Sequence, residues 1–127
     1  MNFSDSFVQG VEHFNRREFW EAHEAWEVIW LAAQTEVEQF LQGLIQIAAA
    51  YHHMKRGTFR GAVRLFEAGL RRLDPFPAGY CDLDRDAVER AARETRERLA
   101  GGAAAGEITY PQLRLLSATP APPFVQW

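Results

Sequence analysis

Apolar side chains recur every three or four residues along most of the first 73 positions, which is the spacing of one face of an α-helix. This pattern predicts four helices, over about Ser4–Asn15, Glu18–Ala33, Glu36–Arg56 and Thr58–Leu73. Thr35 is a suitable N-cap before the third helix, and Gly57 a suitable C′ residue after it. The third helix has the widest apolar arc, so we expect it to be central and buried against more than one neighbour.

The pattern changes after the turn-forming stretch "DPFPAGY". A fifth helix, from Asp82 or Asp84 to about Leu99, has a thin apolar side and opposite charges at four-residue spacing, which predicts a peripheral and largely solvated helix. The run "GGAAAG" predicts a flexible linker. Four of the six prolines follow it, so the end of the chain cannot form one long helix. We expect a short helix over Gln112–Leu116 and then an extended tail.

These elements predict an all-α fold: a compact bundle of about five helices, built from two antiparallel helical hairpins, a peripheral helix and an extended C-terminal tail. Residues 1–75 are expected to form the helical core domain, and residues 76–127 to pack on the same single domain. A weak internal repeat at an offset of forty residues favours two related hairpins, with a tetratricopeptide-like pairing of helices. Its identical pairs are His13/His53, Arg16/Arg56, Phe19/Phe59, Ala22/Ala62 and Glu27/Glu67.

Composition and charge limit the classes of function. The 127 residues suit one domain, and a net charge of −3 favours neither nucleic acid nor an anionic membrane as a partner. The single cysteine, Cys81, excludes an intramolecular disulfide and a cysteine-rich zinc site. The N-terminal residues do not resemble a signal peptide, and no apolar run is long enough to cross a membrane. We therefore expect a soluble, cytoplasmic protein.

Charge is unevenly distributed between two parts of the chain. Seven glutamates face two arginines between Glu12 and Glu38, whereas six basic residues face one glutamate between Lys55 and Arg72. Complementary surfaces of neighbouring helices, or of two subunits, account for this asymmetry. A homodimer is accordingly among the expected partners. Phe124 and Trp127, at the end of the tail, are expected to dock on an apolar surface within the chain or across such a dimer.

The stretch "FWEAHEAWEVIW", residues 19–30, carries the strongest candidate chemistry. His23 and Glu27 are four residues apart, so they share one helix face at the border of the apolar stripe, and Glu24 flanks them. The stretch lacks the second histidine of the zinc motif H-E-x-x-H. Three interpretations remain open: a structural His23–Glu27 hydrogen bond, a ligand-binding or catalytic pair, and a metal site with His52 or His53 as third ligand.

The third helix adds a strip of three glutamines and one histidine opposite its apolar side: Gln39, Gln42, Gln46 and His53. Glutamine both donates and accepts hydrogen bonds, so this strip suits a polar, uncharged ligand or a ladder of interhelical hydrogen bonds. Gly43 within the same helix indicates the close approach of another helix or of a ligand.

Two classes of function follow. The favoured one is a non-enzymatic binding or protein-interaction module, with an unknown small molecule or protein as partner and no cofactor. Its groove is expected to be lined by Trp20, Trp26, Trp30, Gln42, Gln46 and His53. The ligand-binding residues assigned to this module are His23, Glu24, Glu27, Trp30, Gln42, Gln46 and His53. The alternative is a small metal- or acid/base-dependent enzyme centred on His23 and Glu27.

Several of these residues also form a motif. Glu21, Ala22, His23, Glu24, Glu27 and Trp30 are followed by "QGLIQ" at 42–46 and then by Gly57, Gly61 and Ala62. Over about residues 7–73 the chain resembles the family called domain of unknown function 309. The resemblance implies a compact all-α fold and no assigned activity, so it transfers a catalytic role to no residue.

Overall fold

The computed structural model describes residues 3–32 and 35–116. Within them the chain forms five α-helices and two short 3-10 helices, and Leu83 and Leu115 form an isolated β-bridge rather than a strand. The predicted all-α bundle is confirmed. The elements are α1 (Phe3–Asn15), α2 (Phe19–Ala32), α3 (Thr35–Lys55), α4 (Phe59–Leu73), η1 (Tyr80–Asp82), α5 (Arg85–Ala100) and η2 (Ala105–Glu107). The docking predicted for Phe124 and Trp127 lies outside the described residues.

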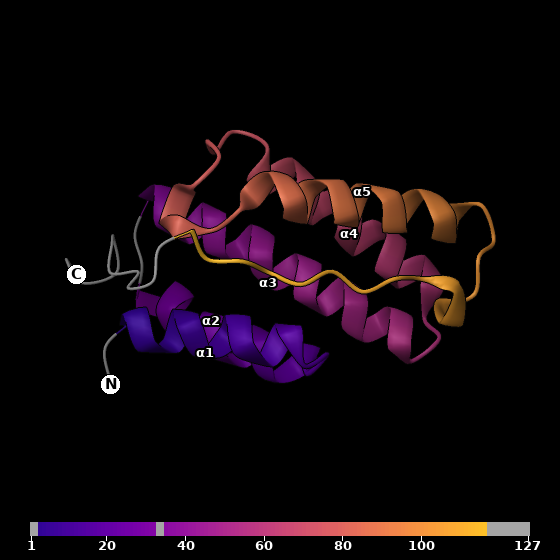
Figure 1. Cartoon of the computed structure of the whole chain (residues 1–127), viewed down its shortest axis with the longest axis horizontal. Coiled ribbons are helices and arrows are strands. Elements are labelled where there is room, and N and C mark those ends of the chain that lie inside the picture. The colour runs from indigo at the N-terminus through magenta and orange to yellow at the C-terminus, as the bar shows by residue number, and fades with distance from the viewer. Residues whose placement is uncertain (1–2, 33–34, 117–127) are drawn as a thin grey trace.

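α3 lies in the middle of the bundle, with α1 and α2 on one side and α4 and α5 on the other (Figure 1). The central position expected from its wide apolar arc is confirmed, because most of its residues from Val37 to Met54 are buried. The chain after α5 then crosses between the two pairs. There Asn15 exchanges two hydrogen bonds with the backbone of Leu113, and the ring of Tyr110 stacks 5.6 Å from that of Phe19.

Glycines allow the closest helix contacts. A Cβ at Gly69 of α4 would lie 2.8 Å from the Ile47 side chain and 3.0 Å from the Gly43 carbonyl oxygen. The close approach predicted at Gly43 is therefore made by α4. Between α1 and α2, a Cβ at Gly10 would overlap the indole of Trp26. Trp26 is fully buried there, and its Nε1 donates to the Phe7 carbonyl at 3.2 Å.

The C-terminal part departs from the predicted pattern. Residues 112–116 are extended rather than helical, because their backbone bonds to distant segments: Leu116 N donates to Asp82 O, and Arg114 O accepts from Asp84 N. The end of the predicted linker overlaps η2. α5 buries Ala92 and Thr95, so the inner face of this helix is wider than expected. These contacts connect residues far apart in sequence, which periodicity does not report.

The apolar spacing of the fourth predicted helix places Phe59 on its inner face, but the Phe59 side chain is 39% exposed. Its equivalent in the forty-residue repeat, Phe19, is buried because Phe14, Tyr51 and Tyr110 pack around its ring. Phe59 has no comparable ring contact among the described residues. The repeat therefore preserves the residue type at this position but not its burial.

The repeat does extend to the backbone of the two corners, α1–α2 and α3–α4. Arg16 N donates to Glu12 O and His13 O, and Glu18 N donates to His13 O. Forty residues later, Arg56 N donates to His52 O and His53 O, and Thr58 N donates to His53 O. Both corners contain a residue in the left-handed region, Arg17 at φ 64° and Gly57 at φ 83°. The tetratricopeptide-like pairing stays a prediction.

We predict that Gly57→Ala lowers the free energy of unfolding by about 1 kcal/mol, because only glycine adopts a positive φ without strain. No atom lies within 4 Å of the new Cβ, so the cost is conformational rather than steric. Urea unfolding measures it. Gly106→Ala is the matched control, since it also meets no neighbouring atom and has no positive φ. An equal effect of the two substitutions would contradict the explanation.

Candidate functional site

One flank of α2 carries His23, Glu27 and Trp30, at spacings of four and three residues, and all three are half-buried. The Trp20 ring stacks on the His23 imidazole at 4.7 Å and also contacts His52 of α3 at 5.3 Å, which places this end of the flank beside α3. On α3, three residues of the predicted strip, Gln42, Gln46 and His53, are half-buried, whereas the fourth, Gln39, is exposed. We call the whole set the polar strip: His23, Glu27, Trp30, Gln42, Gln46 and His53.

The outward side of α3 is half-buried because α2 packs on one side of the helix and α4 on the other. α4 is joined to this side by a hydrogen bond from Arg72 to Gln39. Gln42, Gln46 and His53 are therefore flanked by other helices rather than fully solvated. The fold thus gives these three side chains a partly sheltered environment, in which hydrogen bonds are stronger than in open water.

His23 and Glu27 are partly buried, as predicted, but they do not form the expected hydrogen bond. His23 Nε2 lies 3.7 Å from Glu27 Oε2, which is ion-pair distance and too long for a hydrogen bond. The Glu27 side chain remains 46% exposed, so water competes for its carboxylate. The imidazole is held instead by the parallel indole of Trp20, whose plane differs from its own by 10°.

The polar strip contains buried polar atoms without hydrogen-bond partners. In the described part of the chain such atoms are His23 Nδ1, Trp30 Nε1, Gln46 Oε1, Arg85 Nε and Arg96 Nε. The two arginines form ion pairs through their other nitrogens. Trp30 has no second polar side-chain atom, so its hydrogen-bonding capacity is entirely unused. An unpaired buried group costs about 1–3 kcal/mol. The three unpaired atoms of the polar strip, His23 Nδ1, Trp30 Nε1 and Gln46 Oε1, therefore lower the stability of the fold.

Elsewhere the core satisfies its polar groups. The Tyr51 hydroxyl lies 3.1 Å from Thr95 Oγ1, and Thr95 donates its own proton to the Ala91 carbonyl at 2.8 Å. Tyr51 is therefore the donor to Thr95, and burial raises the pKa of its hydroxyl far above the usual value, which keeps the proton in place. Together with the bonded indole of Trp26, this shows that the fold pairs large aromatic side chains where it can.

The metal interpretation required a third ligand from α3. In the ranges that the structure describes, no group of three or more histidine, cysteine, aspartate or glutamate side chains lies close enough to hold a metal ion. His52 contacts the rings of Trp20 and His53 instead. The histidines of α3 therefore do not complete a ligand set with His23 and Glu27.

Three residues of α2 that were assigned to the groove or to ligand binding differ in position from what was expected. Trp26 is fully buried between α1 and α2, as its place on the apolar stripe of the second helix predicts, so the expectation that it lines a groove was wrong. The apolar stripe of the second helix also predicts Trp30 in the core, but this side chain is half-buried on the flank, where it was assigned to the ligand-binding residues. Glu24 is exposed on the outer side of α2, away from the flank of His23 and Trp30. Sequence spacing predicted the flank, but nothing in it indicated which polar atoms would lack a partner.

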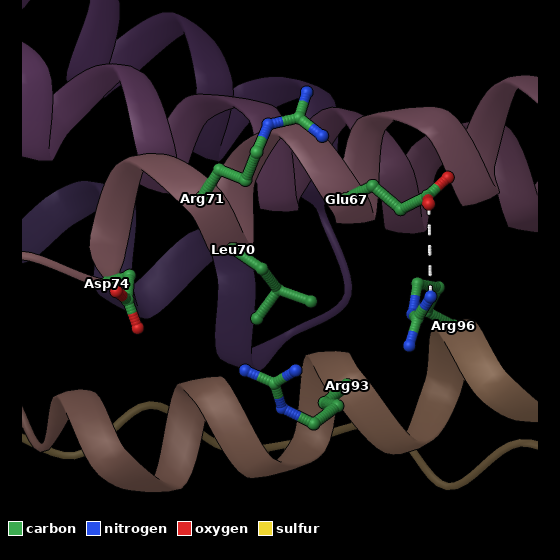
Figure 2. A pocket seen from close by; sticks show the side chains of 6 residues that line it. All are labelled: Glu67, Leu70, Arg71, Asp74, Arg93 and Arg96. Carbon is green, nitrogen blue, oxygen red and sulfur yellow. Dashed lines mark ion pairs between the residues drawn. The ribbon is translucent and has the colours of Figure 1, made fainter.

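A separate hollow of about 440 Å³ lies between α4 and α5 (Figure 2). Leu70 points into it, whereas the guanidinium of Arg71 points away from α5. The other guanidinium groups already have carboxylate partners, because Arg96 lies 3.8 Å from Glu67 and Arg93 lies 2.9 Å from Glu89. The cationic groups that face this hollow are thus neutralised within the fold.

Comparison with known proteins supports the family resemblance. Residues 7–65, which span α1 to the first half of α4, match the family model described as domain of unknown function (DUF309). No curated protein matches the chain. Among the described residues, no helix combines the length and the apolar character needed to span a membrane.

His52 provides a pH-dependent prediction at the edge of the site. Burial lowers its pKa below the usual histidine value, and the positive charge of Arg56 lowers it further. Because the folded state binds this proton less tightly than the unfolded state, the stabilisation is complete above the ordinary histidine pKa and is lost as the pH falls. NMR titration of the imidazole should show the lowered pKa. His52→Gln should reduce the fall in stability on acidification, and an ordinary His52 titration would contradict the account.

Proposed function

We propose that this chain, whose residues 7–65 match the DUF309 family model, is a non-enzymatic binding protein whose polar strip takes a small polar ligand. The observation that carries the proposal is the set of three unpartnered buried atoms, His23 Nδ1, Trp30 Nε1 and Gln46 Oε1. Natural proteins rarely leave such atoms unpaired without a functional reason. A ligand that pairs with them recovers the free energy that the unbound fold gives up.

The three atoms define the chemistry of the ligand. The indole N–H of Trp30 can only donate and Gln46 Oε1 can only accept, whereas His23 Nδ1 does either, depending on its tautomer. A ligand with an acceptor and a donor, such as a carboxamide, complements this set. Trp20 covers one face of the His23 ring and is itself 47% exposed, so we infer that it turns aside when a planar ligand enters.

An acid/base enzyme centred on His23 and Glu27 is the alternative. A general base must reach the proton that it removes. Here Nδ1 of His23 is buried and Nε2 is directed at Glu27. Nε2 therefore faces a carboxylate of the fold rather than a substrate, and Nδ1 has no partner and no carboxylate to support it as a base, which favours binding over proton transfer.

Gln46→Met should separate stability from binding. Met has a similar length and no unpaired oxygen, so we predict that the free energy of unfolding rises by about 1 kcal/mol. Urea unfolding of the full chain measures this. Gln39→Met is the matched control on the same helix: Gln39 is exposed and already accepts a hydrogen bond from Arg72, so its replacement brings no gain.

The same variant tests binding. Benzamide and nicotinamide serve as planar carboxamide probes, with the indole N–H signal of Trp30 as the reporter in ¹H–¹⁵N spectra. We predict that the probes shift this signal in the wild type and in Gln39→Met, and shift it much less in Gln46→Met. Binding that is unchanged by Gln46→Met, together with a loss of stability, would show that Gln46 is structural.

A further inference from the structure

The exposed apolar side chains of the described residues are concentrated on α2. The large exposed ones are Trp20, Val28, Leu31, Phe59 and Leu116, and three of these five belong to α2. Leu31 is 73% and Val28 is 55% exposed. Scattered single apolar residues are normal at a surface, but three at helical spacing on one exposed face indicate an interaction site.

This face is also acidic. α2 contains three glutamates and no lysine or arginine, and among the described residues neither Glu21 nor Glu24 forms an ion pair. Glu24 lies between Trp20 and Val28 on the same side of the helix. We call Trp20, Glu21, Glu24, Val28 and Leu31 the α2 outer face. Its binding partner must supply an apolar surface surrounded by positive charge.

The chain itself presents such a surface. At the start of α4 and the end of α5, a hollow of about 390 Å³ is lined by Phe59, Arg60, Val63, Arg64, Glu67, Leu99 and Ala100. We call it the basic hollow. Phe59, Val63 and Leu99 supply its apolar part. Arg60 and Arg64 are exposed and have no ion pair within the described residues, whereas Glu67 is already paired with Arg96.

We propose that the α2 outer face of one copy of this chain docks in the basic hollow of a second copy. Leu31 and its apolar neighbours enter the hollow, and the free carboxylates of Glu21 and Glu24 meet the free guanidiniums of Arg60 and Arg64. α2 lies on one side of α3 and the α4–α5 pair on the other (Figure 1), so the contact is head-to-tail. Such a contact uses two different patches and builds rings or chains.

A symmetric dimer through α2 alone is the competing arrangement. It would place Glu21 and Glu24 of one copy in the same interface as their counterparts, with no basic residue of α2 to offset them. Like charges that face each other in an interface weaken association, which disfavours that pairing. The head-to-tail contact uses no residue of the polar strip and meets it only through Trp20, which stacks on His23.

Paired charge reversals test the contact in the full-length protein by sedimentation velocity. One variant carries Glu21→Arg with Glu24→Arg, and the other carries Arg60→Glu with Arg64→Glu. We predict that the wild type associates as concentration rises and that each variant alone associates about tenfold or more weakly. An equimolar mixture of the two variants restores association, as does the chain that carries all four substitutions.

Two control variants separate the proposed contact from general effects of charge and of surface substitution. Arg90→Glu with Arg98→Glu, on α5 outside both surfaces, changes the net charge as much as Arg60→Glu with Arg64→Glu does. We expect it to leave association unchanged. Leu31→Ser weakens association, whereas Leu116→Ser, at another exposed leucine, does not. A wild type that stays monomeric at every concentration overturns the proposal. It is also overturned if the variant with reversed α4 charges associates like the wild type, as the symmetric α2 dimer requires, or if the mixture fails to restore association.

Discussion

Close packing of α4 against α3 sets the geometry on which the rest of this bundle depends. Gly43 and Gly69 leave so little space between the two helices that a Cβ on Gly69 would lie within 3.0 Å of the Gly43 carbonyl. Any larger residue at these positions would push the helices apart. Because α4 is held on one side of α3 and α2 packs on the other, the outward strip of α3 is sheltered but not sealed. The polar strip lies in this environment.

Side chains of similar type differ in this fold in whether their buried polar atoms are hydrogen-bonded. The indole of Trp26 and the hydroxyl of Tyr51 both have hydrogen-bond partners in the core, whereas the indole of Trp30 and the amide oxygen of Gln46 have none. Unpaired buried groups reduce stability, and sites of function are where proteins most often accept that cost. Two tryptophans four residues apart on one helix therefore differ in hydrogen bonding: Trp26 is paired in the core and Trp30 is unpaired in the polar strip.

The helices, their central member and the flank of His23 and Glu27 followed from sequence because each depends on spacing within one segment. Gly43 could likewise be identified as a contact point from its place inside a helix. The extended segment 112–116 and the exposure of Phe59 depend on contacts between distant segments, which spacing does not encode. Whether Trp30 and Gln46 have hydrogen-bond partners depends on the positions of all neighbouring atoms. The sequence therefore indicated these two residues as candidates but not that their polar atoms are unpaired.

The hydrogen-bonding state of the Trp30 indole tests the central claim most directly. Ultraviolet resonance Raman spectroscopy detects it through the indole band that shifts when the N–H group donates a hydrogen bond. The Trp30 contribution is obtained as the difference between the wild type and Trp30→Phe, and the Trp26 contribution, from Trp26→Phe in the same way, is the bonded reference within the same protein. The account predicts an unbonded frequency for Trp30 in the ligand-free protein and a bonded one for Trp26. A bonded frequency for both would contradict it.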